Sequence, residues 1–384
     1  MYQDFDLSKI KLTHYKEAKM KTALDYAKQG CDTLIRKFTI NELPPANRYH
    51  YHQGVFLSGM ERTYLLSKDE KYYNYIKGWH DQFIEEDGTM PLMRELEAEN
   101  LQFDDMQPAI MLFHLYEKTG DEKYKRVLDR FAPIVEQWPT NARGGFWHKY
   151  KSKNQMWLDG LYMIGPYAAM YAKYFDKPYF FETVYQQMNL MRRNITDSKT
   201  GLLYHAWDDS KEAPWANQET GLSEEFWGRA IGWYAVAILD ILDYLPDNHP
   251  RRQEFIDAEI DIINSLIKFQ DEKTGLWYQV VNRGDDPANW YETSCTSLFT
   301  YAISKAIKKG IIGDSYANYA HKGYQGVINS LTFEGDDLIV SNICVGTGVG
   351  PYDFYLKRPT VANDLHGMGA FVLMCTEYFD AFGK

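Results

Sequence analysis

Apolar residues recur at helical spacing, three to four positions apart, along most of this chain. The pattern predicts about twelve helices, arranged as six successive hairpins. Their expected ranges are 9–38, 51–67, 69–85, 103–119, 121–136, 156–174, 177–193, 223–245, 249–269, 290–308, 313–330 and 362–381.

A tight turn between helices is the first of two internal repeats. It places Asp near the start of the second helix and Tyr three residues later, at Asp69–Tyr72, Asp121–Tyr124 and Asp176–Tyr179. An Asp there suits both the helix cap and the helix dipole. The Tyr is expected to pack between neighbouring helices.

The second repeat is a Gly turn followed by Leu, Thr or an aromatic residue. It occurs at Gly88, Gly144, Gly201 and Gly275, always before the first helix of a hairpin. Short extended segments are expected at these places. Because every copy lies on the same side of its hairpin, these segments and the long loops should form one rim.

Six hairpins at this spacing predict an all-α fold, a six-hairpin (α/α)6 barrel or toroid with short β segments and long loops on one rim. A linear helical solenoid is the alternative. The position of the long loops favours the toroid, since the loops carry the Trp, His, Arg and Asp residues that usually serve function. No linker rich in Pro, Gly or Ser divides the chain, so residues 1–384 are predicted to form a single catalytic domain.

Charge and composition narrow the class of partner. The net charge of −11 and the pI near 5.4 argue against nucleic acid and anionic membranes as partners. Aromatic residues make up 16% of the chain, which permits a carbohydrate site. The four cysteines are scattered and form no CxxC pair, so they are expected to be buried free thiols. The acidic N-terminus has no apolar core of a signal peptide and no apolar run reaches about 18 residues, so we expect a cytoplasmic protein without a membrane span.

One acid stands alone in an apolar segment, Asp159 in Asn154–Gly165. A carboxyl among Met, Trp, Leu and Tyr should have its charged form disfavoured and its pKa raised. Such a group is a candidate general acid. The alternative is an ordinary cap or first-turn Asp of a helix.

Two further rim segments carry candidate polar groups. His50 and His52 lie two residues apart, so they do not share a helix face, and metal binding is a weak interpretation. Asp104 and Asp105 precede an apolar run, where one could cap a helix while the other points into the funnel.

Two more segments combine aromatic and charged residues. His205 and Trp207 follow a Gly turn, and they suit a sugar platform with a hydrogen-bond donor. Arg229 and Trp233 share one helix face. A carboxylate partner would explain this Arg, either an acid of the protein or a uronate. No phosphate loop, GxSxG, HExxH or dinucleotide fingerprint is present, and the Gly-rich run at 346–350 is interpreted as a rim loop.

Together these segments resemble a known family, glycoside hydrolase family 105, the unsaturated rhamnogalacturonyl hydrolases. The resemblance runs from about residue 48 to the C-terminus and rests on these strings: HYHQGVF, FDDMQPA, GGFWHKY, QMWLDGLYM, HAWDD, FWGRAIGWYA, W-Y-x-T-S and NDLHGMGAF. It departs from the family pattern at Ala109, where Gly is common, and in the variable loop around Cys344–Tyr355. The related unsaturated glucuronyl hydrolases share the fold and fewer of these strings.

The resemblance implies a reaction and a set of site residues. Family members hydrate the C4=C5 double bond of a 4,5-unsaturated uronic acid, with no metal or cofactor in the catalytic step. Asp159 would protonate C4 and then help water attack C5. Asp104 would be the second acid, with Asp105 as the alternative. The resemblance places these further residues in the substrate pocket: Tyr51, His148, Trp157, His205, Trp227, Arg229 and Trp233.

The predicted function is therefore removal of an unsaturated uronic acid, first of all unsaturated galacturonic acid, from the non-reducing end of lyase-generated oligosaccharides such as the rhamnogalacturonan disaccharide. Unsaturated glucuronyl substrates are one alternative. A sugar epimerase or isomerase and a non-catalytic glycan-binding toroid are two others. We expect a monomer or a weak homodimer.

Overall fold

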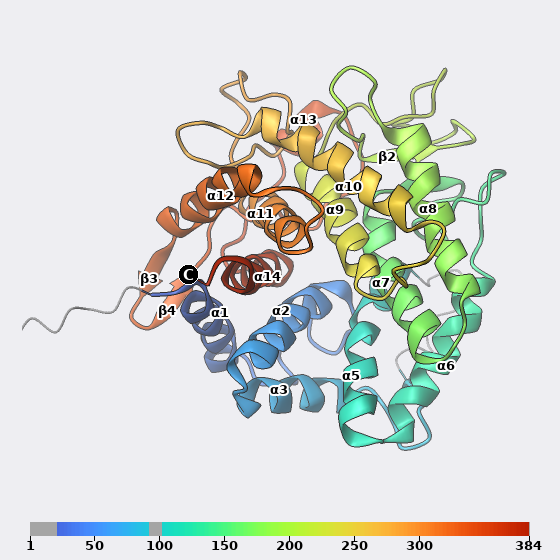
Figure 1. Ribbon diagram of the computed structural model, residues 1–384, viewed down its shortest axis with the longest axis vertical. Coiled ribbons are helices and arrows are strands. Elements are labelled where there is room, and N and C mark those ends of the chain that lie inside the picture. Colours follow the sequence, from blue (N-terminus) through green and yellow to red (C-terminus); the bar gives the residue numbers. More distant parts are fainter. Residues whose placement is uncertain (1–20, 92–101, 384) are drawn as a thin grey trace, which may run out of the picture.

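The computed structural model describes residues 21–91 and 102–383, and within them helices form two concentric rings (Figure 1). The inner ring consists of α2 (Tyr51–Ser67), α5 (Ile110–Thr119), α7 (Asp159–Tyr174), α9 (Gly228–Leu242), α11 (Thr293–Lys308) and α14 (Leu365–Phe382). The outer ring consists of α3 (Glu70–Asp81), α6 (Glu122–Glu136), α8 (Tyr179–Ile195), α10 (Arg252–Leu266), α12 (Ala317–Asn329) and α1 (Ala23–Lys37). The predicted (α/α)6 toroid is thus confirmed.

The ring closes through packing between consecutive inner helices. Helix α14 lies between α2 and α11, and the contacts continue through α9 and α7 to α5. Between α2 and α5 the 3-10 turn η4 (Gln107–Ala109) fills the gap. Gly54 of α2 permits this, because a Cβ there would lie 1.8 Å from Oε1 of Gln107.

Short elements complete the structure. Strand β1 (Gln155–Trp157) pairs antiparallel with β2 (Ala206–Asp208), and β3 (Thr332–Glu334) with β4 (Asp337–Ile339). The remaining elements are 3-10 turns η3 (Phe103–Asp105), η5 (Ile267–Phe269) and η6 (Asp314–Tyr316), and the short helix α13 (Tyr352–Leu356). The sequence pattern did not predict α13 or the β3–β4 hairpin.

Both internal repeats have structural counterparts, with one exception. Gly88, Gly144, Gly201 and Gly275 all have positive φ angles, and isolated β-bridges flank several of these turns, as expected of short extended segments. Asp69 and Asp121 cap α3 and α6, and Tyr72 and Tyr124 are buried. At the third turn Asp176 does not cap α8, whose N-cap is Pro178, and Tyr179 is 48% exposed, so the cap and the packing expected there were both wrong.

Predicted helix boundaries differ from the observed ones mainly at the rim. Residues 103–109, predicted as helix, form two 3-10 turns before α5. Residues 223–227 were also predicted as helix but are not helical, and α9 begins at Gly228. The first twelve residues of the predicted helix 9–38 lie outside the described residues. Among the described residues, no helix is both long and apolar enough to cross a bilayer.

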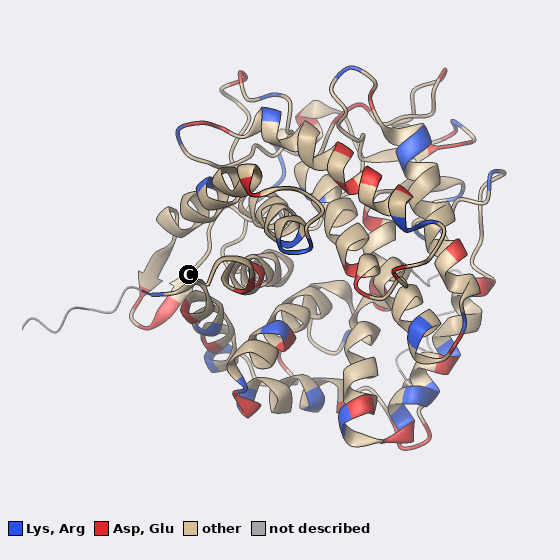
Figure 2. Cartoon of the chain, in the orientation of Figure 1, with Lys and Arg blue, Asp and Glu red and all other residues tan. Residues whose placement is uncertain are grey.

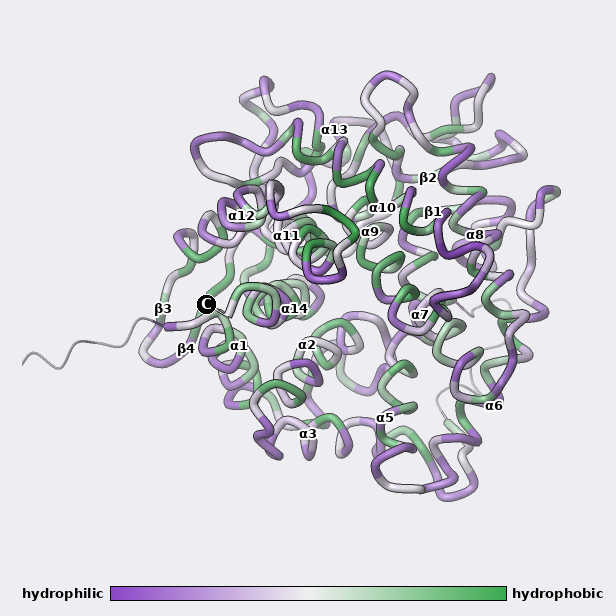
Figure 3. Tube along the Cα trace, viewed as in Figure 1, coloured by the Kyte–Doolittle hydropathy of each residue, from purple (hydrophilic) through white to green (hydrophobic). Residues whose placement is uncertain are grey.

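Hydrophobic and charged residues are distributed differently between the two rings. Helices α7 and α9 carry long hydrophobic stretches (Figure 3) and are buried along nearly their whole length. Most charged residues lie on the outer helices and the connecting loops (Figure 2). The polar groups buried at one end of the inner ring are therefore exceptions that need an explanation.

Candidate active site

A cavity of about 410 Å³ lies at the rim, at the N-terminal ends of α2 and α7. Its wall contains these residues: Arg48, His50, Tyr51, His52, Gln102, Asp104, His148, Lys149, Trp157, Asp159, Met163 and Gly346–Gly348. Five of the nine residues that the sequence assigned to the site line this cavity. They are Tyr51, Asp104, His148, Trp157 and Asp159.

Asp159 is the first residue of α7 and directly follows the β1 segment. The β1–β2 register pairs Trp157 with Ala206, and Leu158 N donates to the carbonyl of His205. This pairing brings Nε2 of His205 to 3.3 Å from Oδ2 of Asp159. A short strand pair thus places an imidazole beside a buried acid that is only 8% exposed.

The expected raised pKa of Asp159 was wrong. Burial on its own raises the pKa of this carboxyl, but hydrogen bonding and charge interaction with His205, together with His148, lower it below its usual value. The segment is apolar in sequence, whereas the space around the carboxyl is not. The sequence pattern missed this because both imidazoles come from segments outside Asn154–Gly165.

The adjacent acids Asp104 and Asp105 occupy different environments. Oδ2 of Asp104 lies 3.2 Å from Nζ of Lys149, and Asp104 belongs to the cavity wall. Asp105 lies 3.4 Å from the guanidinium of Arg48 and accepts from Gln102, and it is not part of the wall.

Their pKa values shift in opposite directions. Burial tends to raise the pKa of Asp104, but the charge of Lys149, with His148 and His50, lowers it to about 2. For Asp105, burial raises the pKa to about 6 despite the nearby Arg48. Asp104 is therefore ionised at neutral pH and faces the cavity, and its role as the second acid stays a prediction.

Trp157 offers an aromatic platform at the cavity, and a second ring supports it from one side. The rings of Trp157 and His148 lie 4.3 Å apart with an interplanar angle of 11°. Nζ of Lys149 lies 5.8 Å from the centre of the Trp157 ring. An aromatic face beside a cation suits a sugar ring that carries a negative charge.

Two histidines of the wall, His50 and His52, are neutral. Nδ1 of His50 lies 2.9 Å from Nδ1 of His52, so one ring donates to the other. Burial lowers the pKa of His50 to about 3 and that of His52 to about 2. The cations of the wall are thus Arg48 and Lys149.

Four of the residues that the sequence assigned to the pocket lie behind its wall. His205 is fully buried between Asp159 and Trp227. Trp227 donates to Oε1 of Gln279. Trp233 stacks on Tyr162 of α7, deeper in the ring, at 4.5 Å.

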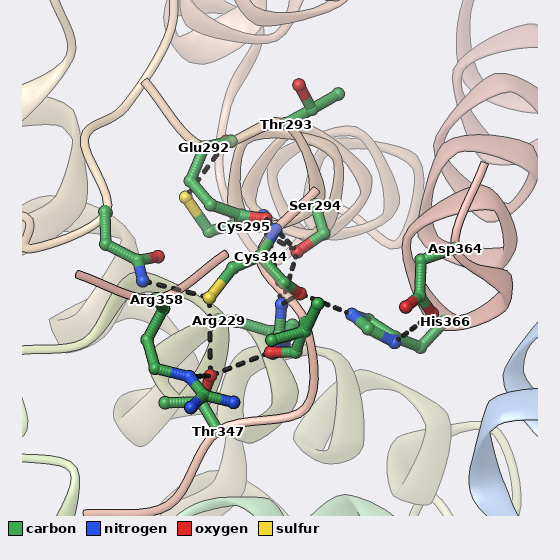
Figure 4. Close-up of polar contacts among 12 residues, drawn as sticks. Arg229, Glu292, Thr293, Ser294, Cys295, Cys344, Thr347, Arg358, Asp364 and His366 are labelled. Atoms are coloured by element: carbon green, nitrogen blue, oxygen red, sulfur yellow. Dashed lines mark hydrogen bonds and ion pairs between the residues drawn. The ribbon is translucent and has the colours of Figure 1, made fainter. Parts of the chain in front are cut away.

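Arg229, the fourth of them, is only 1% exposed and is fully engaged by the protein (Figure 4). Its guanidinium donates to the carbonyls of Cys344 and Val345 and lies 3.7 Å from Glu292. The carboxylate partner that the sequence required is therefore present, and it is an acid of the protein.

One group of side chains near the rim has the composition of a metal site. His52, Asp364 and His366 each offer one ligand atom, all within 4.8 Å of one another. However, His52 is hydrogen-bonded to His50. His366 contacts the carbonyl of Cys344 through Nε2, and its Nδ1 lies 2.8 Å from Oδ1 of Asp364. These contacts account for the group without an ion, so we assign it to the anchoring of the loop at Cys344.

Several wall residues were not assigned to the site from the sequence. Arg48, His50 and His52 belong to a segment that was singled out, and Lys149 directly follows His148, so proximity to a motif was the available signal. Gly346–Gly348 was interpreted as a rim loop, which agrees with its place in the wall.

A helical toroid whose rim cavity combines two carboxylates, two cations and an aromatic platform is the arrangement expected of a carbohydrate-processing enzyme. The particular family follows from comparison with known proteins. A family model described as Glycosyl Hydrolase Family 88 matches residues 26–382, and the chain belongs to this family. The protein is therefore a glycoside hydrolase.

Comparisons with individual proteins point to the same group of enzymes. The chain is 27% identical over 303 residues to the unsaturated rhamnogalacturonyl hydrolase YesR of Bacillus subtilis, covering 77% of this chain and 79% of that protein. It is 25% identical over 346 residues to an unsaturated 3S-rhamnoglycuronyl hydrolase of an Alteromonas species, covering 86% and 78%. A glycoside hydrolase of family 105 from C. acetobutylicum superposes with a TM-score of 0.86 at 35% identity, covering 92% of this chain and 99% of that one. The resemblance to family 105 is confirmed.

Proposed function

We propose that this protein removes a 4,5-unsaturated uronic acid from the non-reducing end of oligosaccharides made by polysaccharide lyases. The first candidate substrate is unsaturated galacturonic acid linked to rhamnose. Support comes from the similarity to YesR over most of both chains and from a cavity that offers an acid, a platform and cations.

The observation that carries the proposal is the position of Asp159. Its carboxyl faces the cavity beside a ring nitrogen of His205, while the other acid of the wall, Asp104, is held by Lys149. Because Lys149 holds Asp104 in its ionised form, Asp159 is the carboxyl left to carry a proton to and from the substrate, once a bound uronate has raised its lowered pKa. Such an arrangement suits protonation of a double bond better than displacement by a pair of acids.

The first step is proton transfer from Asp159 to C4 of the unsaturated ring. The electrons of the C4=C5 bond form the new C4–H bond, and positive charge develops at C5 and the ring oxygen. The ionised Asp104 stabilises this charge electrostatically.

In the second step water attacks C5 and gives a proton back to the Asp159 carboxylate. The product is a hemiketal at C5. Its ring opens to a ketone at C5, which leaves a hemiacetal at C1, and this hemiacetal releases the leaving sugar. The sum is the consumption of one water, and Asp159 ends in the protonation state in which it began.

Substrate contacts follow from the cavity wall. We propose that the sugar ring stacks on the face of Trp157 that His148 does not cover, and that the uronate carboxylate faces Lys149 and Arg48. Tyr51 also lines the cavity. His205, Trp227, Arg229 and Trp233 support these groups from behind, since each is buried against other parts of the protein.

The test is an ultraviolet assay on lyase-generated disaccharides. The conjugated C4=C5 bond absorbs, so hydration removes the absorbance. We expect loss of absorbance with release of the leaving sugar, and no cleavage of the matched saturated disaccharide, which has no double bond to hydrate. Unchanged absorbance with both galacturonyl and glucuronyl substrates, or cleavage of the saturated disaccharide, would sink the proposal.

Alternative substrates and functions are separated by the same assay. Faster loss of absorbance with a glucuronyl or sulfated rhamnose-linked substrate would assign that substrate instead. An epimerase needs an acid and a base on opposite faces of the sugar, whereas His50 and His52 lie side by side and are bonded to each other. A binding protein would leave the absorbance unchanged. The cytoplasmic location and the monomer or weak homodimer stay predictions.

The pH dependence should differ between the free and the bound enzyme. Asp159 donates its proton, so the rate falls as pH rises through its pKa, which in the free enzyme lies below the usual value. A bound uronate adds a negative charge beside C4 and raises that pKa. We therefore expect the alkaline limb of kcat at higher pH than that of kcat/KM, which reports the free enzyme. Steady-state pH profiles check this, and limbs in the reverse order would contradict it.

A further inference from the structure

A buried tyrosine, Tyr355, contacts the same imidazole that lies beside Asp159, the ring of His205. Tyr355 belongs to α13 and is fully buried. Its hydroxyl lies 2.8 Å from Nδ1 of His205, whose Nε2 lies 3.3 Å from Asp159. Asp159, His205 and Tyr355 come from three distant segments and form a chain of polar contacts. Of the three, only Asp159 faces the cavity.

The partners of Tyr355 indicate which atom donates in its hydrogen bond with His205. The backbone N–H of Gly350 donates to the Tyr355 hydroxyl at 3.4 Å. An amide N–H cannot accept, so the single hydroxyl hydrogen remains for Nδ1 of His205. Burial raises the pKa of the Tyr355 hydroxyl, which keeps that hydrogen in place. A neutral His205 that accepts at Nδ1 must carry its own hydrogen on Nε2, toward Asp159.

The loop that carries Tyr355 is fixed to the inner ring (Figure 4). Cys344 donates its N–H to Glu292, and its carbonyl accepts from Arg229 and His366. Gln279 donates to Sγ of Cys344 and to the carbonyl of Tyr355. The hydroxyl is therefore held against His205 by anchors at both ends of the loop.

We propose that Tyr355 is a positioning residue, whose hydroxyl fixes the Nε2–H tautomer and the orientation of His205 so that this N–H faces the carboxylate of Asp159. The inference rests on the proposed function for its kinetic part. The tautomer itself is a property of the free protein and can be observed without substrate.

Other titratable and charged groups near Asp159 also influence its pKa, so the test variant must leave them unchanged. The titratable and charged groups that face it are His205, His148, Tyr51 of α2, Tyr355 of α13 and Arg229 of α9. Only Tyr355 is changed in the test variant, Tyr355→Phe, which removes one hydroxyl. The control is Tyr352→Phe on the same helix, whose hydroxyl donates to Asp286 instead.

Kinetics of the two variants give the first readout. Without the hydroxyl, His205 is free to carry its hydrogen on Nδ1, and the lone pair on Nε2 then disfavours the Asp159 carboxylate. We expect little change in KM of Tyr355→Phe, because the hydroxyl lies behind His205 and does not line the cavity. The alkaline limb of kcat/KM should move to higher pH, while Tyr352→Phe behaves like the unchanged protein. A fall in kcat with no shift of the pH limb would overturn the positioning role.

Nitrogen NMR of histidine-labelled protein gives the second readout, with the His205 signals assigned by their absence in His205→Gln. The wild-type protein should show Nε2–H for His205, and Nδ1–H in the wild type would overturn the proposal even if Tyr355→Phe fails to fold. If the Nε2–H tautomer is observed but no unsaturated uronide is consumed, the proposed function fails and the tautomer assignment stands.

Discussion

Replacing Asp159 by Asn should lower the rate of absorbance loss by about 10²–10⁴-fold, the usual contribution of a general acid and base. The amide has the same shape and can still accept from His205, so the fold and the substrate contacts should persist. It cannot release a proton to C4 or take one from water. The measurement is kcat on the substrate that the wild-type protein consumes, with KM expected to change little.

Asp105→Asn is the matched control for this variant. Asp105 is also buried and receives the same substitution, but its carboxyl contacts Arg48 and Gln102 and is not itself part of the cavity wall. We expect it to keep most of the activity. Asp104→Asn should lose activity as well, because Asp104 faces the cavity. Near-full activity of Asp159→Asn, combined with loss in Asp105→Asn, would reverse these roles.

Replacing Arg229 by Met should destabilise the fold by about 3–5 kcal/mol, the range for breaking a buried ion pair. The change leaves Glu292 buried without its cation and removes two hydrogen bonds to the backbone at Cys344 and Val345. The free energy of unfolding is measured by denaturant titration. The double variant with Glu292→Gln should recover part of the loss, since the uncompensated charge is then absent.

The same variant distinguishes the two roles considered for Arg229. If the guanidinium bound the uronate directly, Arg229→Met would raise KM strongly while stability changed by less than about 1 kcal/mol, and the anchoring role would be lost. We expect the opposite order of effects, because the guanidinium is buried and already bonded on both sides.

Helical periodicity was sufficient to predict the ring of hairpins, because each inner helix must bury a wide apolar face. It was weakest where other contacts determine the backbone. Residues 103–109 form 3-10 turns since η4 must fit against Gly54, a constraint from a distant helix. The helix α13 is only five residues long and has no periodic signal.

Single motifs identified the wall of the cavity but not the network behind it. Asp159, Trp157 and His148 lie on adjacent segments, so their proximity was expected from the chain itself. The contact of Asp159 with His205 depends on β-pairing, and the contact of Arg229 with Glu292 depends on the packing of α9 against α11. Such long-range contacts also reversed the expected shift in the pKa of Asp159.

The seam between α1 and α14 has a consequence for how the chain reaches this state. A Cβ at Gly30 of α1 would lie 3.3 Å from Met368 and Val372 of α14, so the two helices pack closely although more than 300 positions separate them. During synthesis α1 emerges long before its partner α14. The earlier hairpins can form in order as local units, whereas closure of the ring is the most non-local event of folding. The part of α1 that packs against α14 therefore stays exposed to solvent or to a chaperone until α14 has been synthesised.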